Sequence, residues 1–544
     1  MTQPLVRFPQ QSVSNLEAAL LCAFAAWSLA IAASRQLPSW RTPLTSPWLA
    51  LLAAVIVASV AAPAFRTNAF HMTGRLTAAF GIFLLTVTGL TTGTRLRAAL
   101  GLVVAGGVIV AGLAILEYAQ VRPVLNALKA FRPGITVVGS QMRAGGSLQY
   151  PTITSMYLEV VFAFGVGLLL WEVDARRPAR AAAWFAALLI VAEAITLTFT
   201  RAGLISMAAV LVLIAALRYR RLGSDAGVRL LAALSVLVVV LFAGSQSAQW
   251  MWLRFTSGGQ ESWYRAEVAA PADVAMATGA RSAVPIEITN TGRITWDSQG
   301  DPPFFLSYHW LQSEGDRFVV FDGARTSFPT PVEPGATVAI TADVRAPLQP
   351  GQYRLAWDVV VEHRLWFSTE PGAAAPMLSR AMVSGDLLDG VVRTIPPPKL
   401  TVRPGRLQLW TAAVKMIAAH PLLGVGPDNF RLLYGDYAGL TVADPRTHSN
   451  DMYLEVLAGS GLAGGLAFAW LLWRAAGVLL PSLRAPAATA MGVGAALLAV
   501  ALHGFVDSFL SFGPTYVLFA LTLGFAVACA RGPAADMEAN AHRV

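Results

Sequence analysis

The chain has 544 residues, of which 55% are hydrophobic and only 13% are charged. Soluble domains carry about 25% charged residues, so this composition excludes an ordinary soluble protein and indicates an integral membrane protein. The formal net charge of +9 does not indicate nucleic-acid binding, because the basic residues are scattered through loops between apolar segments.

Apolar stretches of about 20 residues, long enough to cross a bilayer as a helix, recur along the chain. The first is longer than the apolar core of a secretory signal, so we keep it as a span. Cys22 and Cys529 lie inside such stretches, which gives neither a disulfide framework nor a cysteine metal site. We expect eleven spans, near residues 16–34, 47–64, 77–94, 97–119, 152–172, 181–200, 202–218, 228–246, 453–473, 486–502 and 514–530.

Two short loops between spans, residues 174–180 and 218–223, are densely basic. The positive-inside rule predicts that both are cytoplasmic. Alternation of the spans then places Arg201, the loop 120–151 and residues 247–452 on the outer, periplasmic face, with the C-terminal tail inside.

Residues 262–403 change character, from long apolar runs to short alternating segments bounded by glycine and proline turns. Alternation with period two predicts antiparallel strands at the spacing of a β-sandwich. We expect their tryptophans to pack in the core rather than to stack on sugars, and residues 394–400 to form a stiff linker. The expected strands lie at residues 284–296, 304–311, 337–347 and 353–368.

Residues 406–420 have the pattern of an amphipathic helix at the membrane surface. Trp410, Val414 and Ile417 share one apolar face, and Thr411 and Lys415 are displaced from it.

Arginines gather on the predicted outer face, where the positive-inside rule predicts few. Arg201 is a cation within an apolar run, where charged groups are functional candidates. Guanidinium groups form planar, bidentate contacts with phosphate, so we expect Arg201 and Arg406, with Arg143 and Arg254, to bind a diphosphate. Three further arginines of this face are expected to be ordinary loop residues, namely Arg132, Arg431 and Arg446.

His448, Asp451 and Glu455 directly precede or begin an apolar run. If a helix begins at Ser449 or Asn450, which are both good N-caps, spacings of three and seven place these side chains on one face. An imidazole suits general base catalysis, and a helix N-terminus attracts anions. We therefore expect His448 to be catalytic and Asp451 and Glu455 to help bind the substrate. The alternative is that His448 caps the helix and that the carboxylates of Asp451 and Glu455 complement its dipole.

Four stretches together resemble the bacterial O-antigen ligase and polymerase superfamily of membrane glycosyltransferases. One departure concerns the histidine, because the family histidine aligns with Asn450 rather than with His448. The likeness covers roughly residues 130–255 and 404–470. It is carried by RAGGSLQYPTITSMYLEV (143–160), TFTRAG (198–203), RLQLWTAAVKMIAAHPLLGVGPDNF (406–430) and HSNDMYLEVLAGSGLAGG (448–465).

The resemblance implies a cofactor-free and metal-independent transfer at the periplasmic face of the bacterial inner membrane. The donor is a glycan linked to undecaprenyl diphosphate, and the acceptor is a hydroxyl of a glycan or lipid. Arg201 and Arg406 match the arginines that bind the diphosphate, and His448 assists the acceptor hydroxyl.

The expected fold is mainly α, a polytopic bundle with an inserted β-sandwich that resembles the Trp-rich Ig-like domains of bacterial glycan enzymes. A polymerase of the same superfamily, a polysaccharide flippase and a glycan-binding protein remain alternatives, and no protein partner of the sandwich is indicated. The expected parts are a membrane bundle (1–255), the sandwich (256–403), an amphipathic helix with its loop (404–452) and C-terminal spans (453–544).

Overall fold

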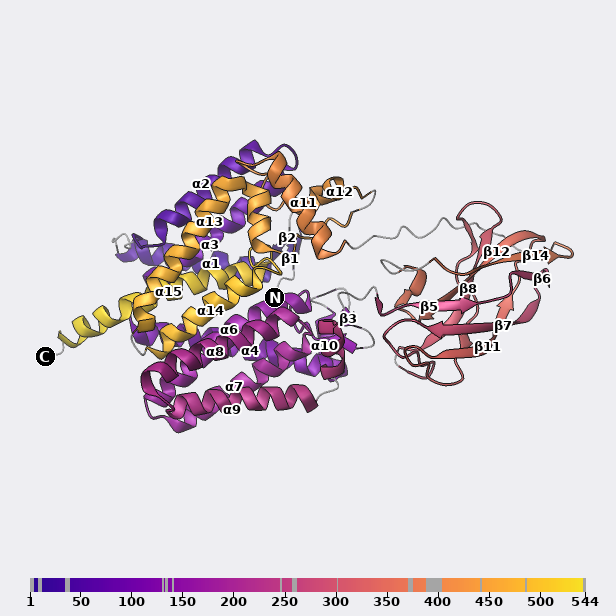
Figure 1. Ribbon diagram of the computed structural model, residues 1–544. Coiled ribbons are helices and arrows are strands. Elements are labelled where there is room, and N and C mark those ends of the chain that lie inside the picture. Colours follow the sequence, from indigo (N-terminus) through magenta and orange to yellow (C-terminus); the bar gives the residue numbers. More distant parts are fainter. Residues whose placement is uncertain are drawn as a thin grey trace. The chain divides into compact units, whose positions relative to one another are not determined.

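The chain divides into two compact units, shown in Figure 1. The first consists of residues 1–138, 142–251 and 404–544 and is helical; the second consists of residues 139–141 and 252–403. The computed structural model describes residues 4–7, 12–34, 40–129, 132, 136–138, 141–244, 247–256, 262–300, 302–369, 375–387, 404–440, 443–484 and 487–541. The expected linker at 394–400 lies outside these residues.

Within the described residues, nine helices are long and apolar enough to cross a membrane. The expected polytopic helical bundle is thereby confirmed. The nine are α1 (Asn15–Ser34), α3 (Arg66–Gly89), α4 (Gly93–Tyr118), α6 (Pro151–Asp174), α7 (Pro178–Leu197), α8 (Arg201–Leu222), α9 (Ala226–Gly244), α13 (Met452–Arg484) and α15 (Gly513–Ala541). The two remaining expected spans are the shorter apolar helices α2 (Thr45–Ala61) and α14 (Ala488–His503).

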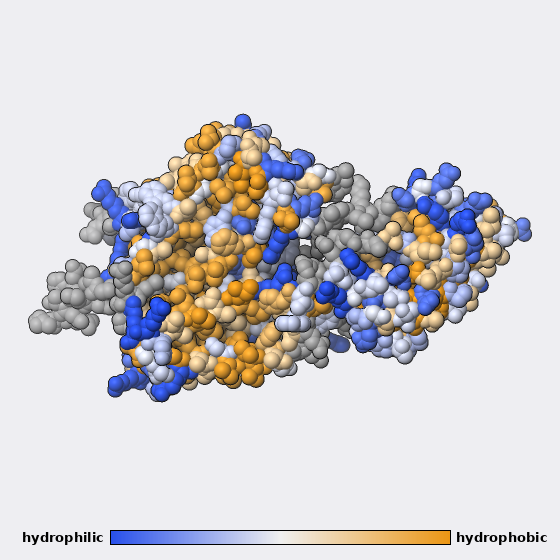
Figure 2. All heavy atoms as spheres, viewed as in Figure 1, coloured by the Kyte–Doolittle hydropathy of each residue, from blue (hydrophilic) through white to orange (hydrophobic). Residues whose placement is uncertain are grey.

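Large apolar side chains cover the outside of the helical unit. Figure 2 shows them along the length of the helices, with polar residues gathered toward the helix ends. Leu102 and Ile109 on α4, Val236 on α9 and Trp473 on α13 are more than half exposed. An apolar surface of this extent is stable in contact with lipid and not with water.

The boundaries expected for the third span, 77–94, were wrong, because α3 begins at Arg66 and ends at Gly89. His71 and Arg75 interrupt the apolar run in the sequence, but both lie on the exposed side of the helix. Met72 and Leu76 are buried on the other side. A helix whose first turns are amphipathic is missed when spans are read from uninterrupted apolar runs.

The two basic loops lie at the same end of the helical unit, because one buried arginine joins them. Arg218, near the end of α8, is 2.5 Å from a carboxylate oxygen of Asp174 at the end of α6. It is also 2.5 Å from Asp225, which precedes α9. Since α8 runs from Arg201 to this end, Arg201 lies at the opposite end of the bundle.

Four short helices and two short hairpins complete the described part of this unit and its junction with the second. Helix α11 buries Leu409, Ala412 and Met416 against its neighbours and leaves Val414 exposed. Trp410 and Ile417, which were expected on the same face as Val414, are half-buried. The placement of α11 at a membrane surface remains a prediction. The short elements are α5 (Arg122–Leu128), α10 (Ser247–Thr256), α11 (Arg406–Ala419), α12 (Phe430–Ala438), β1 (Pro4–Arg7), β2 (Ser12–Ser14), β3 (Thr136–Val138) and β4 (Gln141–Arg143).

The second unit contains two β-sheets (Figure 1). The larger has the order β10-β8-β12-β14-β6, with β9 beside β8 and β13 beside β12, and the smaller has the order β11-β7-β5. The pairs are antiparallel except for β14 with β6, which is parallel. The strands are β5 (Ala266–Ala269), β6 (Asp273–Ala277), β7 (Arg281–Asn290), β8 (Phe304–Gln312), β9 (Phe318–Val320), β10 (Thr326–Ser327), β11 (Thr337–Arg345), β12 (Gly351–Val361), β13 (Leu365–Trp366) and β14 (Leu378–Ser384).

Aromatic side chains join the two sheets. Trp310 on β8 is fully buried and donates its indole N–H to the carbonyl of Arg345 on β11 at 2.9 Å. Trp296 is also fully buried, so both are core residues as expected, whereas Trp366 is half-buried beneath the guanidinium of Arg325. The expected strand 353–368 ends at Val361, because His363 adopts a left-handed backbone (φ 59°) that turns the chain.

Helix α13 is kinked at Gly461, where φ is 60° and ψ is −162°. The kink opens the helical hydrogen-bond ladder, and the loop after α11 bonds to the opened backbone. The amides of Val425 and Gly426 donate to the carbonyls of Ala458 and Gly459, each at 2.9 Å, and the amide of Leu462 donates to the carbonyl of Pro421 at 2.8 Å. The loop is thereby fixed on both sides of the kink.

Replacing Gly461 with alanine is expected to lower the free energy of unfolding by at least about 2 kcal/mol, through backbone strain and a clash. A Cβ atom there would collide with the backbone of Leu422. Gly477 on the same helix is surrounded by open space, since a Cβ added to it would meet no atom within 4 Å, so Gly477→Ala is the matched control. Thermal unfolding in detergent should separate the two variants, and equal midpoints would contradict the expectation.

Candidate active site

The turn before α8 is held by Arg143. Its Nε atom donates to the carbonyl of Thr198 at 2.8 Å, and its Nη2 atom donates to the hydroxyl of Thr200 at 3.1 Å. Phe199 between them has a left-handed backbone (φ 52°), which is costly for a bulky residue and persists only where its surroundings enforce it. The structure thus places Arg143 where it fixes the start of α8, and Arg201 is the first residue of that helix.

A buried carboxylate supports the loop that carries Arg143. Glu117 on α4 is fully buried and accepts hydrogen bonds from the amides of Gly145 and Gly146 at 3.0 and 2.7 Å. It also forms an ion pair with Arg132, which is 6% exposed. The loop is therefore fixed by a charge network in the protein interior.

Arg406 opens α11 as Arg201 opens α8. Its guanidinium lies close enough to Arg201 to be repelled by it and close enough to Asp507 to be attracted. Two cations at the N-termini of two helices, where the helix dipoles are also positive, create a strongly positive region. Such a region favours an anion, and phosphate groups bind at helix N-termini for this reason.

Three further arginines of the predicted outer face are paired with carboxylates. Arg132 pairs with Glu117, Arg431 with Asp428 at 2.9 Å, and Arg446 with Asp444 at 2.9 Å. The expectation of an ordinary loop residue was wrong for Arg132, which is buried in its ion pair with Glu117, whereas Arg446 is exposed and Arg431 is half-buried.

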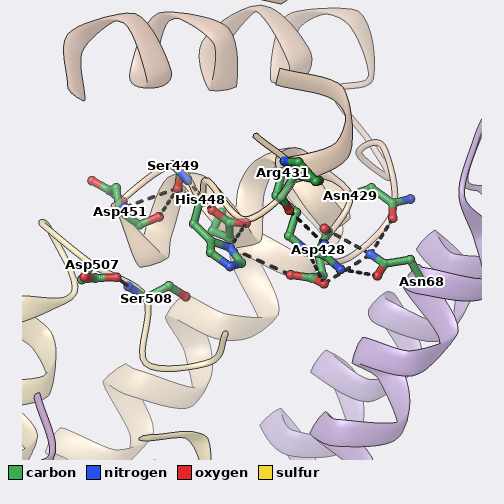
Figure 3. Close-up of polar contacts among 11 residues, drawn as sticks. Asn68, Asp428, Asn429, Arg431, His448, Ser449, Asp451, Asp507 and Ser508 are labelled. Atoms are coloured by element: carbon green, nitrogen blue, oxygen red, sulfur yellow. Dashed lines mark hydrogen bonds and ion pairs between the residues drawn. The ribbon is translucent and has the colours of Figure 1, made fainter. Parts of the chain in front are cut away.

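His448 lies between two carboxylates, as Figure 3 shows in part. Its Nδ1 atom is 3.3 Å from Oε1 of Glu455 and 3.9 Å from Oδ1 of Asp428. The second oxygen of each carboxylate is held elsewhere: that of Glu455 accepts from the amide and hydroxyl of Ser449 at 2.9 and 2.6 Å. That of Asp428 accepts from Arg431. The imidazole is thus oriented by groups that are themselves fixed.

The expected helix start at Ser449 or Asn450 was wrong, because α13 begins at Met452. Asn450 has a left-handed backbone (φ 54°), and Oδ1 of Asp451 accepts from the amides of Tyr453 and Leu454 at 2.9 and 2.8 Å. Asp451 is therefore the N-cap, and His448 reaches Glu455 from the preceding loop rather than from the same helix face.

Asp507 joins this site and was not among the residues expected there. It lies in the turn between α14 and α15, is 8% exposed, and interacts electrostatically with His448 and Arg406. The side chain of His503, at the end of α14, contacts Glu159 at 2.9 Å and also interacts electrostatically with Asp507. The available signal was a carboxylate directly after an apolar span.

Arg254 lies in the last turn of α10, within the second compact unit. Its role in binding a substrate remains a prediction.

Asp428, His448 and Glu455 each offer one ligand atom, and these atoms lie within 4.8 Å of one another. One imidazole and two carboxylates suit a divalent cation such as Mn²⁺ or Zn²⁺. The same atoms are also balanced without a cation when His448 is protonated, since it then donates toward Glu455.

Stability of the protein should depend on pH through His448. Burial lowers the pKa of His448, but the hydrogen bond to Glu455 and the charges of Glu455, Asp428 and Asp507 outweigh it, so the pKa is raised above 6.5. A raised pKa means that the stabilisation is complete below the ordinary value and is lost as the pH rises through the folded-state value. The gap in melting temperature between wild type and His448→Asn should therefore shrink from about pH 6 to about pH 9; a gap that grew would contradict this.

Residues 398–469 match a family model described as O-Antigen ligase. This segment of the chain is therefore similar to the O-antigen ligase superfamily. No curated protein matches the chain significantly. The matched O-antigen ligase segment includes α11, α12 and the first half of α13, and with them Arg406, Asp428 and His448.

The O-antigen ligase match and the apolar helices together define a multi-pass membrane protein with a glycosyltransferase-like domain. The helical unit supplies Arg201 and Asp507 from outside the matched segment. The candidate site is therefore assembled from distant parts of the chain.

Proposed function

We propose that the protein transfers a glycan from undecaprenyl diphosphate to an acceptor hydroxyl. The observation that carries this proposal is that Arg201 and Arg406 begin two helices and interact electrostatically, and that Asp507 interacts with both Arg406 and His448. A lipid diphosphate supplies the negative charge that two adjacent cations favour.

In the proposed reaction the acceptor oxygen attacks the anomeric carbon of the donor sugar. The bond between that carbon and the diphosphate oxygen breaks, and undecaprenyl diphosphate leaves with the bonding electron pair. Preorganised donors aimed at such developing charge lower the barrier by roughly 3 to 4 kcal/mol each. Arg201 and Arg406 are the residues proposed to do so.

His448 is proposed to accept the proton of the acceptor hydroxyl as the new glycosidic bond forms. Glu455 and Asp428 face its Nδ1 atom and stabilise the imidazolium that results. General base assistance of this kind contributes about 10²- to 10⁴-fold in rate.

We place the site on the periplasmic side of the bacterial inner membrane. Arg201 lies at the opposite end of the bundle from the basic loops, which the positive-inside rule assigns to the cytoplasm. The second unit would then be periplasmic. The same chemistry serves a ligase and a polymerase, which differ only in the acceptor.

The test is an assay with purified protein in sealed lipid vesicles, undecaprenyl-diphosphate-linked glycan and two acceptors, a lipid A core and a second lipid-linked glycan. A new glycosidic product with either acceptor is expected, and the productive acceptor identifies a ligase or a polymerase. Glycan that crosses vesicle membranes without any new bond would instead indicate a flippase and reject the proposal.

A further inference from the structure

A titratable pair is buried inside the helical unit, beneath the proposed site. Glu159, in the third turn of α6, is 0% exposed, and His503, the last residue of α14, is 1% exposed. The carboxylate oxygens of Glu159 lie 3.0 and 2.9 Å from Nδ1 of His503. Ionisable groups within spanning helices are costly, which makes this pair a functional candidate.

His503 anchors the turn that carries Asp507. Its carbonyl accepts hydrogen bonds from the amides of Val506 at 2.9 Å and Asp507 at 3.0 Å. The carbonyl of the next residue, Gly504, accepts from the amide of Met452 at 2.7 Å, where α13 begins. The turn is thus tied to α6 through Glu159 and to α13 through Met452.

Charges alternate from this pair into the proposed site. His503 interacts with Glu159, Asp507 and Arg406, and Asp507 in turn interacts with His448 and Arg406. A change of charge at Glu159 therefore alters the field at Asp507 and, through it, at the groups proposed to bind the donor and activate the acceptor.

A contribution to the stability of the fold does not by itself explain why Glu159 and His503 are buried as a pair. Apolar residues of similar volume often stabilise a protein as well as a buried ion pair does. In addition, Nε2 of His503 is buried without a hydrogen-bond partner among the described residues, which is itself unfavourable.

We propose that Glu159 and His503 are positioning residues, which hold the 503–508 turn so that Asp507 stays beside Arg406 and His448. This inference rests on the proposed function, since it concerns the same site. The pair touches no reacting atom; it acts through the placement and charge of Asp507.

Glu159→Gln preserves the shape of the side chain and a hydrogen bond to His503 but removes the charge. Small displacements of catalytic groups are costly, so kcat should fall about 10- to 100-fold while KM for the lipid-linked glycan changes less than about threefold. Glu193→Gln is the matched control, because Glu193 is a half-buried carboxylate on α7. It should leave both constants unchanged.

The double variant Glu159→Leu/His503→Leu separates positioning from packing. It should unfold at a temperature close to that of the wild type and yet remain as slow as Glu159→Gln. Full activity in the double variant, or wild-type kcat in Glu159→Gln, would overturn the inference while leaving the proposed function intact.

A second readout does not depend on activity. Ser508 is 1% exposed, so a cysteine there, in a chain with Cys22 and Cys529 replaced by alanine, should react slowly with a maleimide. Adding Glu159→Gln should accelerate labelling at least about fivefold, as expected when local opening becomes easier. If the wild type forms no glycosidic product but Glu159→Gln still accelerates labelling of the cysteine at position 508, the proposed function fails and the anchoring of the turn stands. If Glu159→Gln leaves the labelling rate unchanged, the anchoring is rejected.

Discussion

Replacing Arg406 or Arg201 with alanine is expected to slow glycan transfer by about 10²- to 10³-fold. Each variant removes one of the two cations that begin α8 and α11 and that interact electrostatically. Lysine at either position should restore part of the rate, because it retains the charge but not the planar, bidentate donors of guanidinium. Initial rates at saturating donor, measured for the alanine and lysine variants, provide the check.

Arg220→Ala is the control for these variants. Arg220 lies exposed in the last turn of α8, at the opposite end from Arg201. The Arg220→Ala variant should transfer glycan at the wild-type rate. If all three alanine variants were equally slow, the loss would reflect the helix or the overall charge, and the diphosphate site would have to be sought elsewhere.

Glu117→Ala is expected to lower the free energy of unfolding by about 3 to 5 kcal/mol, the usual cost of breaking a buried ion pair from one side. The substitution leaves the buried guanidinium of Arg132 without its carboxylate, and it removes the acceptor for the amides of Gly145 and Gly146. Unfolding by heat in detergent, followed by tryptophan fluorescence, measures the loss.

The variants Glu117→Gln and Glu193→Ala make this prediction specific. Glutamine keeps an oxygen acceptor for the two amides but not the charge, so its effect should be intermediate. Glu193 is half-buried on α7, so Glu193→Ala should lower the free energy of unfolding far less than Glu117→Ala does. A Glu117→Ala protein as stable as Glu193→Ala would show that the ion pair contributes little to the fold.

Most of the membrane architecture could be predicted from hydropathy, because lipid requires each span to be apolar over a fixed length. The eleven expected spans correspond to described helices. The boundaries expected for α3 were wrong because the prediction relied on hydropathy alone. His71 and Arg75 break the apolar run, although the helix continues through them. Where a helix presents a polar side, length and hydropathy no longer define its ends.

The candidate site could be predicted only in part. The contact between His448 and Glu455 was expected from a helical spacing of seven, yet it arises because Asp451 caps the helix and the preceding loop folds back. Local spacing cannot reveal contacts between distant segments, which is why Asp428 and Asp507 were missed. The catalytic and binding roles assigned to the expected residues remain predictions.

Arg143 illustrates a further limit of reasoning from residue type. Arg143 was expected to bind the anion, and this role remains a prediction. Its residue type did not indicate that it also donates to the carbonyl of Thr198 and to the hydroxyl of Thr200. Guanidinium donors serve backbone oxygens as readily as phosphate oxygens. Which they serve depends on the turn geometry, and the sequence does not encode that turn in any local signal that we recognise.

The kink at Gly461 has a mechanical consequence. Because the segment 421–426 is bonded to α13 on both sides of the kink, Arg406 at the far end of α11 and His448 ahead of α13 are carried by one stiff body. Arg201 is carried by another helix, α8, whose start is braced through Arg143. If the helices move apart to admit the proposed lipid-linked donor, we therefore expect the distance between the guanidinium groups of Arg201 and Arg406 to change and the spacing between Arg406 and the imidazole to be preserved.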